Sequence, residues 1–220
     1  MTLKKNLHHL MLEIPTGVKL VAVSKTQQVE TIQALYDLGQ RMFGENKVQE
    51  LVNKQPQLPE DIRWHFIGHL QRNKVKFVVP ITSLIHSIDS FRLLCEVNKE
   101  AARISRRINC LLQFHIATEE NKFGLDWEEA VIMLTSPDFP ELKNVAICGV
   151  MGMATFTDNQ TIVRKEFCQL KVIFDRLKES YFKESPDFKE ISMGMTSDFR
   201  IAIEEGSTLV RIGTMLFGSR

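Results

Sequence analysis

Leu20-Val21-Ala22-Val23-Ser24-Lys25-Thr26 is a short apolar run that ends in a lysine. Its apolar centre, from Val21 to Val23, fits a strand that is buried on both faces, as in a parallel sheet. An ammonium group buried at the end of such a strand would lose its hydration, so Lys25 either leaves the strand into solvent or serves a site. The heptapeptide by itself favours the exit into solvent, and the remainder of the chain has to decide between the two.

Apolar runs of this kind recur along the chain and alternate with helical patterns. A short amphipathic helix is predicted first, because Leu3, Leu7 and Leu10 have helical spacing. After the opening strand, further strands are predicted at 42–46, 64–68, 84–89, 109–116, 145–151, 188–194 and 208–213. Helical patterns lie between them at 32–38, 48–52, 75–79, 91–106, 127–134, 163–181 and 198–205.

Eight strands that alternate with helices predict a single TIM-type (β/α)8 barrel, a fold of about 200 to 250 residues. An open doubly wound sheet shows the same alternation, and the count of eight favours the barrel. We therefore predict an α/β protein with one domain, residues 1–220, and an extra helix at its N-terminal end. The stretches near Pro56, Pro137 and Pro186 are interpreted as loops rather than as domain linkers.

The composition excludes several classes of protein. With 44% hydrophobic and 25% charged residues and a net charge of +1, the chain has no basic stripe with interleaved aromatic residues, so no nucleic-acid partner is expected. No stretch is long and apolar enough to span a bilayer, and the N-terminus lacks an apolar signal region. The four cysteines are widely spaced and predict reduced core thiols, so we expect a cytoplasmic protein.

Polar residues stand where the predicted strands end. They are Lys25, Asn46, His69, Ser192 and Arg211. Each has a structural alternative: Asn46 fits a helix N-cap, His69 a turn residue and Ser192 a loop hydroxyl. In a barrel, however, the C-terminal ends of the strands form the active site, so one shared site explains the five residues more economically.

The last two strands end in segments that suit an anion. Ser192-Met193-Gly194-Met195-Thr196-Ser197 contains small and hydroxyl residues before a helix, so that backbone N–H groups can face a phosphate. Val210-Arg211-Ile212-Gly213-Thr214 repeats this pattern on the next strand. Barrels of this type frequently bind phosphate with loops seven and eight, where these segments lie.

A lysine opposite a phosphate site suggests a particular ligand. Burial disfavours the charged form of an amine, and the neutral amine is the nucleophile that forms an imine with an aldehyde. Pyridoxal 5′-phosphate (PLP) has both the aldehyde and the phosphate. Arg211 is then placed to hydrogen-bond the ring nitrogen, and its permanent charge would weaken the ring as an electron sink.

Two other candidate sites are less well supported. His65 and His69 are four residues apart, but a strand and turn separate them instead of a helix, and no Glu lies between them, so no metal site is predicted. Met151 and Met153 lie beside glycines and could line a cofactor pocket, although core packing is the simpler interpretation.

The motifs together resemble a known family, the pyridoxal phosphate homeostasis proteins, which are single-domain relatives of the alanine racemase barrel and have fold type III of PLP proteins. The resemblance covers nearly the whole chain. Its most specific parts are Ala22-Val23-Ser24-Lys25-Thr26, Phe43-Gly44-Glu45-Asn46, Trp64-His65-Phe66-Ile67-Gly68-His69-Leu70-Gln71, Ser192-Met193-Gly194-Met195 and Val210-Arg211-Ile212-Gly213-Thr214.

The resemblance implies a role for each matching residue. It implies that Lys25 carries PLP as a Schiff base, that Arg211 lies near the ring nitrogen and that Asn46 lines the ring pocket. The residues that it assigns to the phosphate are Ser192, Gly194, Gly213 and Thr214. The sequence departs from the family at Lys47, where a tyrosine is usual, and varies around Met151, both at positions that the resemblance places near the ring edge.

The function implied by the resemblance is that of a PLP carrier or regulator of vitamin B6 pools, without an established turnover. PLP-dependent apo-enzymes would be its partners, and a monomer or weak dimer its form. A weak amino-acid racemase or another Schiff-base enzyme is the alternative, and a phosphate-sugar enzyme without cofactor ranks last. Alanine racemases draw a second base from a tyrosine of another domain, whereas Tyr36 and Tyr181 lie in helical patterns and no second domain is expected.

Overall fold

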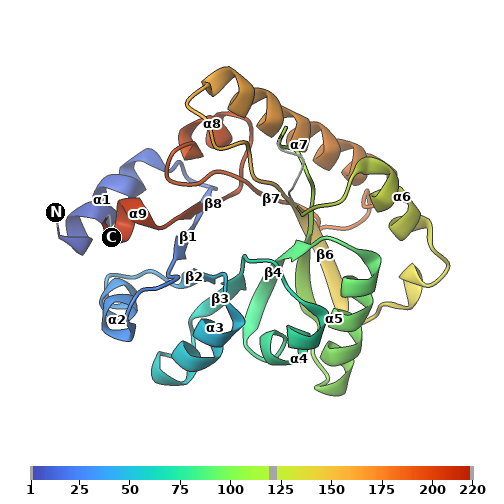
Figure 1. The fold of residues 1–220 in the computed structure, drawn as a ribbon, viewed down its shortest axis with the longest axis horizontal. Coiled ribbons are helices and arrows are strands. Elements are labelled where there is room, and N and C mark those ends of the chain that lie inside the picture. The colour runs from blue at the N-terminus through green and yellow to red at the C-terminus, as the bar shows by residue number, and fades with distance from the viewer. Residues whose placement is uncertain (1, 119–122, 219–220) are drawn as a thin grey trace.

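The computed structural model describes residues 2–118 and 123–218 and confirms the (β/α)8 barrel (Figure 1). The strands form a closed ring in the order β1 to β8, and every neighbouring pair is parallel. The strands are β1 (Lys19–Val23), β2 (Met42–Glu45), β3 (Arg63–Phe66), β4 (Thr82–Ile88), β5 (Ile108–Gln113), β6 (Val145–Met151), β7 (Glu190–Ser192) and β8 (Leu209–Ile212).

Helices surround this ring of strands (Figure 1). They are α1 (Leu3–Glu13), α2 (Val29–Asp37), α3 (Val48–Lys54), α4 (Val75–Val78), α5 (Phe91–Arg103), α6 (Trp127–Thr135), α7 (Gln160–Ser180), α8 (Phe199–Glu204) and α9 (Thr214–Phe217). Short 3₁₀ turns lie at Gln55–Gln57, Arg72–Lys74 and Phe139–Glu141. The expected extra helix is α1, which lies beside α9, and Asn6 Nδ2 donates a hydrogen bond to the Leu216 carbonyl at 2.9 Å.

The core has two parts, as expected for a barrel wrapped in helices. The larger part fills the space between strands and helices. The smaller part packs inside the barrel, where it consists of Val21, Leu84, Leu111, Ala146, Cys148, Met151 and Leu209. Met151 is therefore a core residue with 1% of its surface exposed, in agreement with the simpler interpretation of the sequence.

β7 is shorter than the predicted 188–194. It spans Glu190–Ser192, and its register with β8 is the pair Ser192↔Leu209. Gly194 ends the extended backbone because its φ of +93° lies in the left-handed region. A Cβ at this position would lie 2.6 Å from the Cβ of Ala202 in α8, so the close approach also requires glycine.

The cysteines and the helices allow two further comparisons with the sequence. Cys110 and Cys148 are buried thiols and Cys95 is half-buried, but Cys168 is exposed on α7, so the prediction of a core thiol is wrong there. Cys168 lies outside the apolar seam of its helix, which explains its exposure. Within 2–118 and 123–218, none of the helices has the length and apolar character needed to cross a membrane.

Candidate functional site

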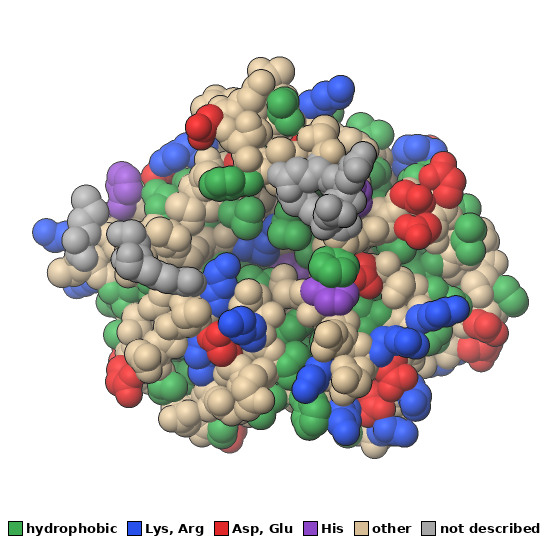
Figure 2. All heavy atoms as spheres, in the orientation of Figure 1, with side chains coloured by type: hydrophobic (Ala, Val, Ile, Leu, Met, Phe, Trp, Pro, Cys, Tyr) green, Lys and Arg blue, Asp and Glu red, His purple; other side chains and the backbone are tan. Residues whose placement is uncertain are grey.

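A cavity of about 560 Å³ lies at the C-terminal ends of the strands. It brings together six of the residues predicted from the sequence: Lys25, Asn46, His69, Arg211, Gly213 and Thr214. The other lining residues are Val23, Ile67, Gly68, Gln113, Phe123, Met153, Phe156, Met195, Thr196 and Ser197. Hydrophobic, histidine and Lys or Arg side chains meet near the middle of the face shown in Figure 2.

Lys25 lies at the rim of this cavity rather than in its wall. β1 ends at Val23, so Lys25 is two residues beyond the strand, and its side chain is exposed. The burial expected for this amine is therefore wrong, because the chain has already left the barrel wall. Its ammonium group has no hydrogen-bond partner within the residues that the structure describes, so it is free to meet a ligand in the cavity.

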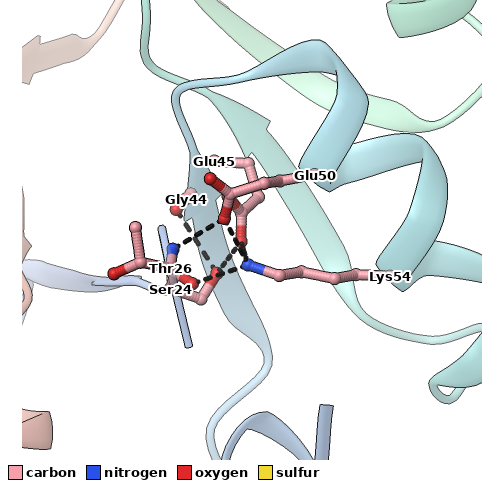
Figure 3. A network of polar contacts seen from close by, with 6 residues as sticks. All are labelled: Ser24, Thr26, Gly44, Glu45, Glu50 and Lys54. Atoms are coloured by element: carbon pink, nitrogen blue, oxygen red, sulfur yellow. Dashed lines mark hydrogen bonds and ion pairs between the residues drawn. The ribbon is translucent and has the colours of Figure 1, made fainter. Parts of the chain in front are cut away.

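The backbone around Lys25 is held by a buried ionic network (Figure 3). Lys54 Nζ donates to the Ser24 carbonyl at 2.9 Å, to Glu45 Oε1 at 2.8 Å and to Glu50 Oε2 at 2.8 Å. Glu50 Oε2 also accepts the backbone N–H of Thr26 at 2.6 Å, and Glu45 Oε1 accepts the hydroxyl of Ser24 at 2.7 Å. The network thus connects the ends of β1 and β2 with α3.

The two carboxylates of this network respond differently to their surroundings. Burial raises the pKa of Glu45, and the hydrogen bonds from Lys54 and Ser24 only partly oppose it. Burial also raises the pKa of Glu50, but the hydrogen bonds from Lys54 and from the Thr26 N–H outweigh it, so that this pKa is lowered. Glu50 is therefore the more firmly ionised partner of Lys54.

Arg211, in contrast, is buried, with 4% of its surface exposed. Its Nη1 donates to Ser192 Oγ at 2.6 Å and its Nη2 to the Gly152 carbonyl at 3.1 Å. Burial lowers the pKa of Arg211 to about 10, and the nearby Asp198 opposes this shift. The guanidinium therefore stays charged at neutral pH and presents its remaining N–H groups to the cavity.

Two histidines extend this hydrogen-bonded chain into the barrel. Ser192 Oγ lies 2.9 Å from His86 Nδ1, and His86 Nε2 lies 3.0 Å from His65 Nδ1. Burial lowers the pKa of His65 to about 3 and that of His86 well below its usual value, so both rings are neutral.

The direction of the first contact is fixed because a guanidinium can only donate, so Ser192 Oγ accepts from Arg211. Ser192 Oγ also contacts His86 Nδ1, and His86 Nε2 contacts His65 Nδ1, with the donor at each contact set by the tautomer of the ring. Arg211 is thus oriented through its head group by side chains from β3, β4 and β7.

Asn46 lies at the end of β2, half-buried, between two cavities. Its Oδ1 is buried and has no hydrogen-bond partner among the described residues. The second cavity, of about 530 Å³, is lined by Lys47 and other residues of α3 and the β3–α4 region. Gly68 allows the close approach of β3, since a Cβ there would lie 2.1 Å from the Asn46 carbonyl oxygen.

The residues assigned to phosphate lie in different places. Gly213 and Thr214 line the cavity at the start of α9, where the first N–H groups of a helix have no partner within the helix. Met195 and the two residues after it line the same cavity. Ser192 and Gly194 do not line it: Ser192 bonds Arg211, and the Gly194 carbonyl accepts the Arg211 backbone N–H at 2.9 Å.

The rim opposite Lys25 is aromatic. His69 Nδ1 lies 3.2 Å from Asp89 Oδ2, and its ring stacks on Phe123 with centroids 3.9 Å apart. Phe156 also lines the cavity, with 88% of its surface exposed. Met153 lines the cavity, whereas Met151, the other methionine that could line a pocket, lies in the core.

Sequence reasoning did not find the residues that act behind the site. His65 and His86 lie inside predicted strands, and Glu45 and Lys54 are nine positions apart on different elements. The sequence offers one signal for such residues, a charged residue or a histidine within an apolar pattern that predicts a buried strand. Among the described residues, no group of three or more His, Cys, Asp or Glu side chains is arranged to hold a metal ion.

Comparisons with known proteins agree with this geometry. The family model described as "Alanine racemase, N-terminal domain" matches residues 1–220. The "Pyridoxal phosphate homeostasis protein" of Aquifex aeolicus (strain VF5) is 39% identical over 203 residues, which cover 92% of this chain and 87% of that protein.

Solved structures show the same fold. PipY of Synechococcus elongatus PCC7942 gives a TM-score of 0.92 at 34% identity without PLP, and 0.89 at 33% identity with PLP bound. Both alignments cover 99% of this chain and 100% of the PipY chain. Alanine racemase of Clostridium difficile 630 gives a TM-score of 0.78 at 14% identity and covers 99% of this chain but 56% of the racemase, so it shares the fold.

Proposed function

Because the chain belongs to the family of pyridoxal phosphate homeostasis proteins, we propose that it binds PLP and takes part in intracellular vitamin B6 homeostasis. PLP is held as a Schiff base on Lys25. The observation that supports this proposal is the single cavity in which an exposed amine from the β1 end faces a buried guanidinium from β8. The solved PipY structure with PLP bound is a relative in which this fold holds the cofactor.

The residues present fit this ligand. The Lys25 nitrogen joins the aldehyde carbon, and the aldehyde oxygen leaves as water. Arg211 supplies hydrogen-bond donors and positive charge near the ring nitrogen, a group that accepts a hydrogen bond. Asn46 lines the same cavity, and its buried Oδ1 has no hydrogen-bond partner among the described residues.

We assign the phosphate to the segments that line the cavity. Gly213 and Thr214 contribute backbone N–H groups at the start of α9, and Thr196 and Ser197 contribute hydroxyls from the loop after β7. The family resemblance also assigns Ser192 and Gly194 to phosphate. These two residues contact the cavity residue Arg211, at its guanidinium and at its backbone N–H respectively. A Cβ at Gly213 would lie 3.2 Å from the Val23 carbonyl, so glycine keeps β8 close to β1.

The protein is proposed to be a carrier or regulator without fast turnover. PLP supplies an electron sink when bound, and a cationic Arg211 at the ring nitrogen weakens that sink because it disfavours protonation there. The exposed rim around Lys25 and Phe156 gives solvent and a partner access to the cofactor. We further propose cytoplasmic PLP-dependent apo-enzymes as recipients, a single domain over residues 1–220, and a monomer or weak dimer that binds no nucleic acid.

The absorption spectrum of the purified protein tests this function. A Schiff base of PLP absorbs in the near-ultraviolet or visible region, and borohydride should fix the cofactor on the peptide that contains Lys25. Lys25→Ala is expected to remove the band and the labelled peptide, while Lys171→Ala, which changes a partly exposed lysine paired with Asp175, should retain both. A band that persists in Lys25→Ala would reject the site, and a protein that stays colourless with added PLP would reject the function.

A second candidate function is a weak amino-acid racemase or another Schiff-base enzyme. It is favoured by the His69–Asp89 pair, since the carboxylate orients a ring that stands at the rim of the cavity and can exchange protons. With saturating PLP, loss of α-deuterium from amino acids should then depend on both Lys25 and His69. Exchange no faster than in a Lys25→Ala control would exclude this candidate.

A further inference from the structure

The two peptide groups that flank Lys25 are both held by one buried network. The carbonyl of Ser24 belongs to the peptide before Lys25, and it accepts a hydrogen bond from Lys54. The N–H of Thr26 belongs to the peptide after Lys25, and it donates to Glu50. Lys54 and Glu50 are themselves 2.8 Å apart, so one ion pair closes the two contacts into a ring (Figure 3).

We propose that Glu45, Glu50 and Lys54 are positioning residues that fix the backbone on both sides of Lys25 and thereby aim its amine at the cavity. The inference rests on the proposed function, because it assumes that Lys25 reacts with the aldehyde. None of the three residues lines the cavity of Lys25, so their effect passes through the backbone.

Lys54 is the centre of the network because all its donors are used. An ammonium group has three N–H donors, and the three acceptors are a backbone carbonyl and two carboxylates. The residue is 8% exposed, so these bonds are shielded from water. The carboxylate of Glu45 is fully buried and also bonds the Ser24 hydroxyl, which ties the network to the end of β2.

Thr26 shows why the loop needs such support. Its φ of +63° lies in the left-handed region, which a β-branched residue rarely adopts. Such a conformation persists only where surrounding contacts hold it in place. Here Glu50 Oε2 accepts the Thr26 N–H at 2.6 Å. The backbone direction at Lys25 is therefore set by the protein, while the side chain, exposed and without a hydrogen-bond partner among the described residues, keeps its freedom.

This arrangement predicts a selective effect on bond formation. Misplacing a reacting group weakens its reaction strongly, whereas non-covalent contacts made elsewhere in the cavity persist. Pyridoxine 5′-phosphate carries an alcohol in place of the aldehyde and cannot form the Schiff base. Its affinity therefore measures the non-covalent contacts of the cavity alone. The ratio of PLP affinity to pyridoxine 5′-phosphate affinity then measures how well Lys25 is placed.

Lys54→Met is the first variant to test, since it keeps the length of the side chain and removes its donors. We expect PLP affinity, from absorbance titration, to fall about tenfold, with pyridoxine 5′-phosphate affinity changed less than about twofold. Lys178→Met is the matched control, because Lys178 also holds a backbone carbonyl, that of Ser185, but on the loop after α7. The control should change neither affinity.

Glu50 provides a second variant pair that does not depend on the folding of Lys54→Met. Glu50→Gln keeps an oxygen acceptor for the Thr26 N–H, so it should retain most of the affinity ratio. Glu50→Ala removes the acceptor and should lower the ratio about tenfold. Because Glu50 is partly exposed, its replacement does not leave a fully buried gap.

The outcomes separate the two proposals. An unchanged ratio in Glu50→Ala and Lys54→Met, or an equal loss of both affinities, would overturn the positioning role, because a purely structural network would behave in that way. If Lys54→Met does not fold, the Glu50 pair decides the matter. A PLP band that survives Lys25→Ala would instead reject the proposed function and this inference with it.

Discussion

Lys25 and Arg211 are two cations that line one cavity, and the fold holds them in opposite ways. Lys25 is exposed, its backbone is held on both sides by Lys54 and Glu50, and its ammonium group is free of partners among the described residues. Arg211 is buried, and its head group is held by Ser192 and the Gly152 carbonyl. One residue is fixed at the main chain and the other at the end of its side chain.

The difference matches what each cation has to do in the proposed function. An amine that forms and releases a covalent bond has to move, so the fold can fix the backbone of the lysine but not its terminal nitrogen. A guanidinium that only donates hydrogen bonds works best when it does not move. The Lys25 region therefore uses a largely buried ionic network, and the Arg211 region uses neutral histidines inside the barrel.

The largest expected effect is on the Arg211 side. His86→Leu removes the imidazole that contacts both the Ser192 hydroxyl and His65 Nδ1, so that buried His65 Nδ1 loses its partner and Ser192 keeps only its bond from Arg211. We expect a loss of about 3 kcal/mol in the free energy of unfolding, measured by urea denaturation. Lys25→Met, on the exposed side, should stay within about 0.5 kcal/mol of the original protein. Equal losses in the two variants would remove the contrast between the regions.

The pH dependence of stability should be dominated by the buried histidines. The pKa of His65 is about 3 in the folded protein against an ordinary value of 6.5, so between these pH values the unfolded chain binds a proton that the folded chain does not. The free energy of unfolding then falls as the pH falls, by about 1.4 kcal/mol per pH unit for this residue. His65→Asn should flatten the slope by that amount between pH 4 and pH 6 in chemical denaturation, which a retained slope would contradict.

Glu45 should act with the opposite sign. Its pKa is raised in the folded protein, so its contribution to stability is present below its unfolded pKa and is lost as the pH rises through the folded value. Glu45→Gln should therefore make the acid limb of the same stability curve steeper. A flatter limb would show that Glu45 is ionised throughout.

A smaller effect is expected at the turn after Lys25. Thr26→Gly relieves a left-handed backbone at φ +63°, although the added freedom of the unfolded chain offsets part of the gain. The free energy of unfolding should rise by up to about 1 kcal/mol. Thr161→Gly, in the first turn of α7, should lower it instead, so a fall in both variants would count against strain at Thr26.

The smallest effect is expected at the aromatic rim. Phe123 is 58% exposed and stacks on His69, so Phe123→Ala should leave the stability within about 0.5 kcal/mol. The PLP affinity in an absorbance titration should fall about twofold to threefold, because the His69 ring loses its stacking partner. A loss as large as that expected for Lys54→Met would show that the rim, and not the network of Glu45, Glu50 and Lys54, controls the placement of Lys25.

The sequence predicted the barrel because strand and helix periods alternate strongly and because polar residues stand where the strands end. The same rule placed Lys25, Asn46, His69 and Arg211 at one cavity. It failed for the supports behind them: a buried lysine in α3 has the same pattern as a solvated one, and His86 has the same pattern as any strand residue. Their partners come from other elements, so their roles depend on contacts that no local pattern encodes.

Local errors also had physical causes. Lys25 was expected to be buried, yet the strand ends two residues earlier and the amine lies outside the barrel wall. The resemblance assigns Ser192 to phosphate, which stays a prediction, and in the structure its hydroxyl contacts Arg211 and His86. α9 escaped notice because four residues are too few to show a helical period.

The narrow pairing between β7 and β8 has a consequence for the motions of the barrel. β7 has three residues, and its register with β8 is one residue pair. Local opening costs least where few backbone bonds must break, so amide hydrogens at this seam should exchange with heavy water sooner than those of β4 and β5. Arg211 on β8 and the loop after β7 both line the cavity, so a ligand that contacts both would hold the seam closed and slow the exchange. Amide exchange at β7 and β8 would then report cavity occupancy without any chromophore.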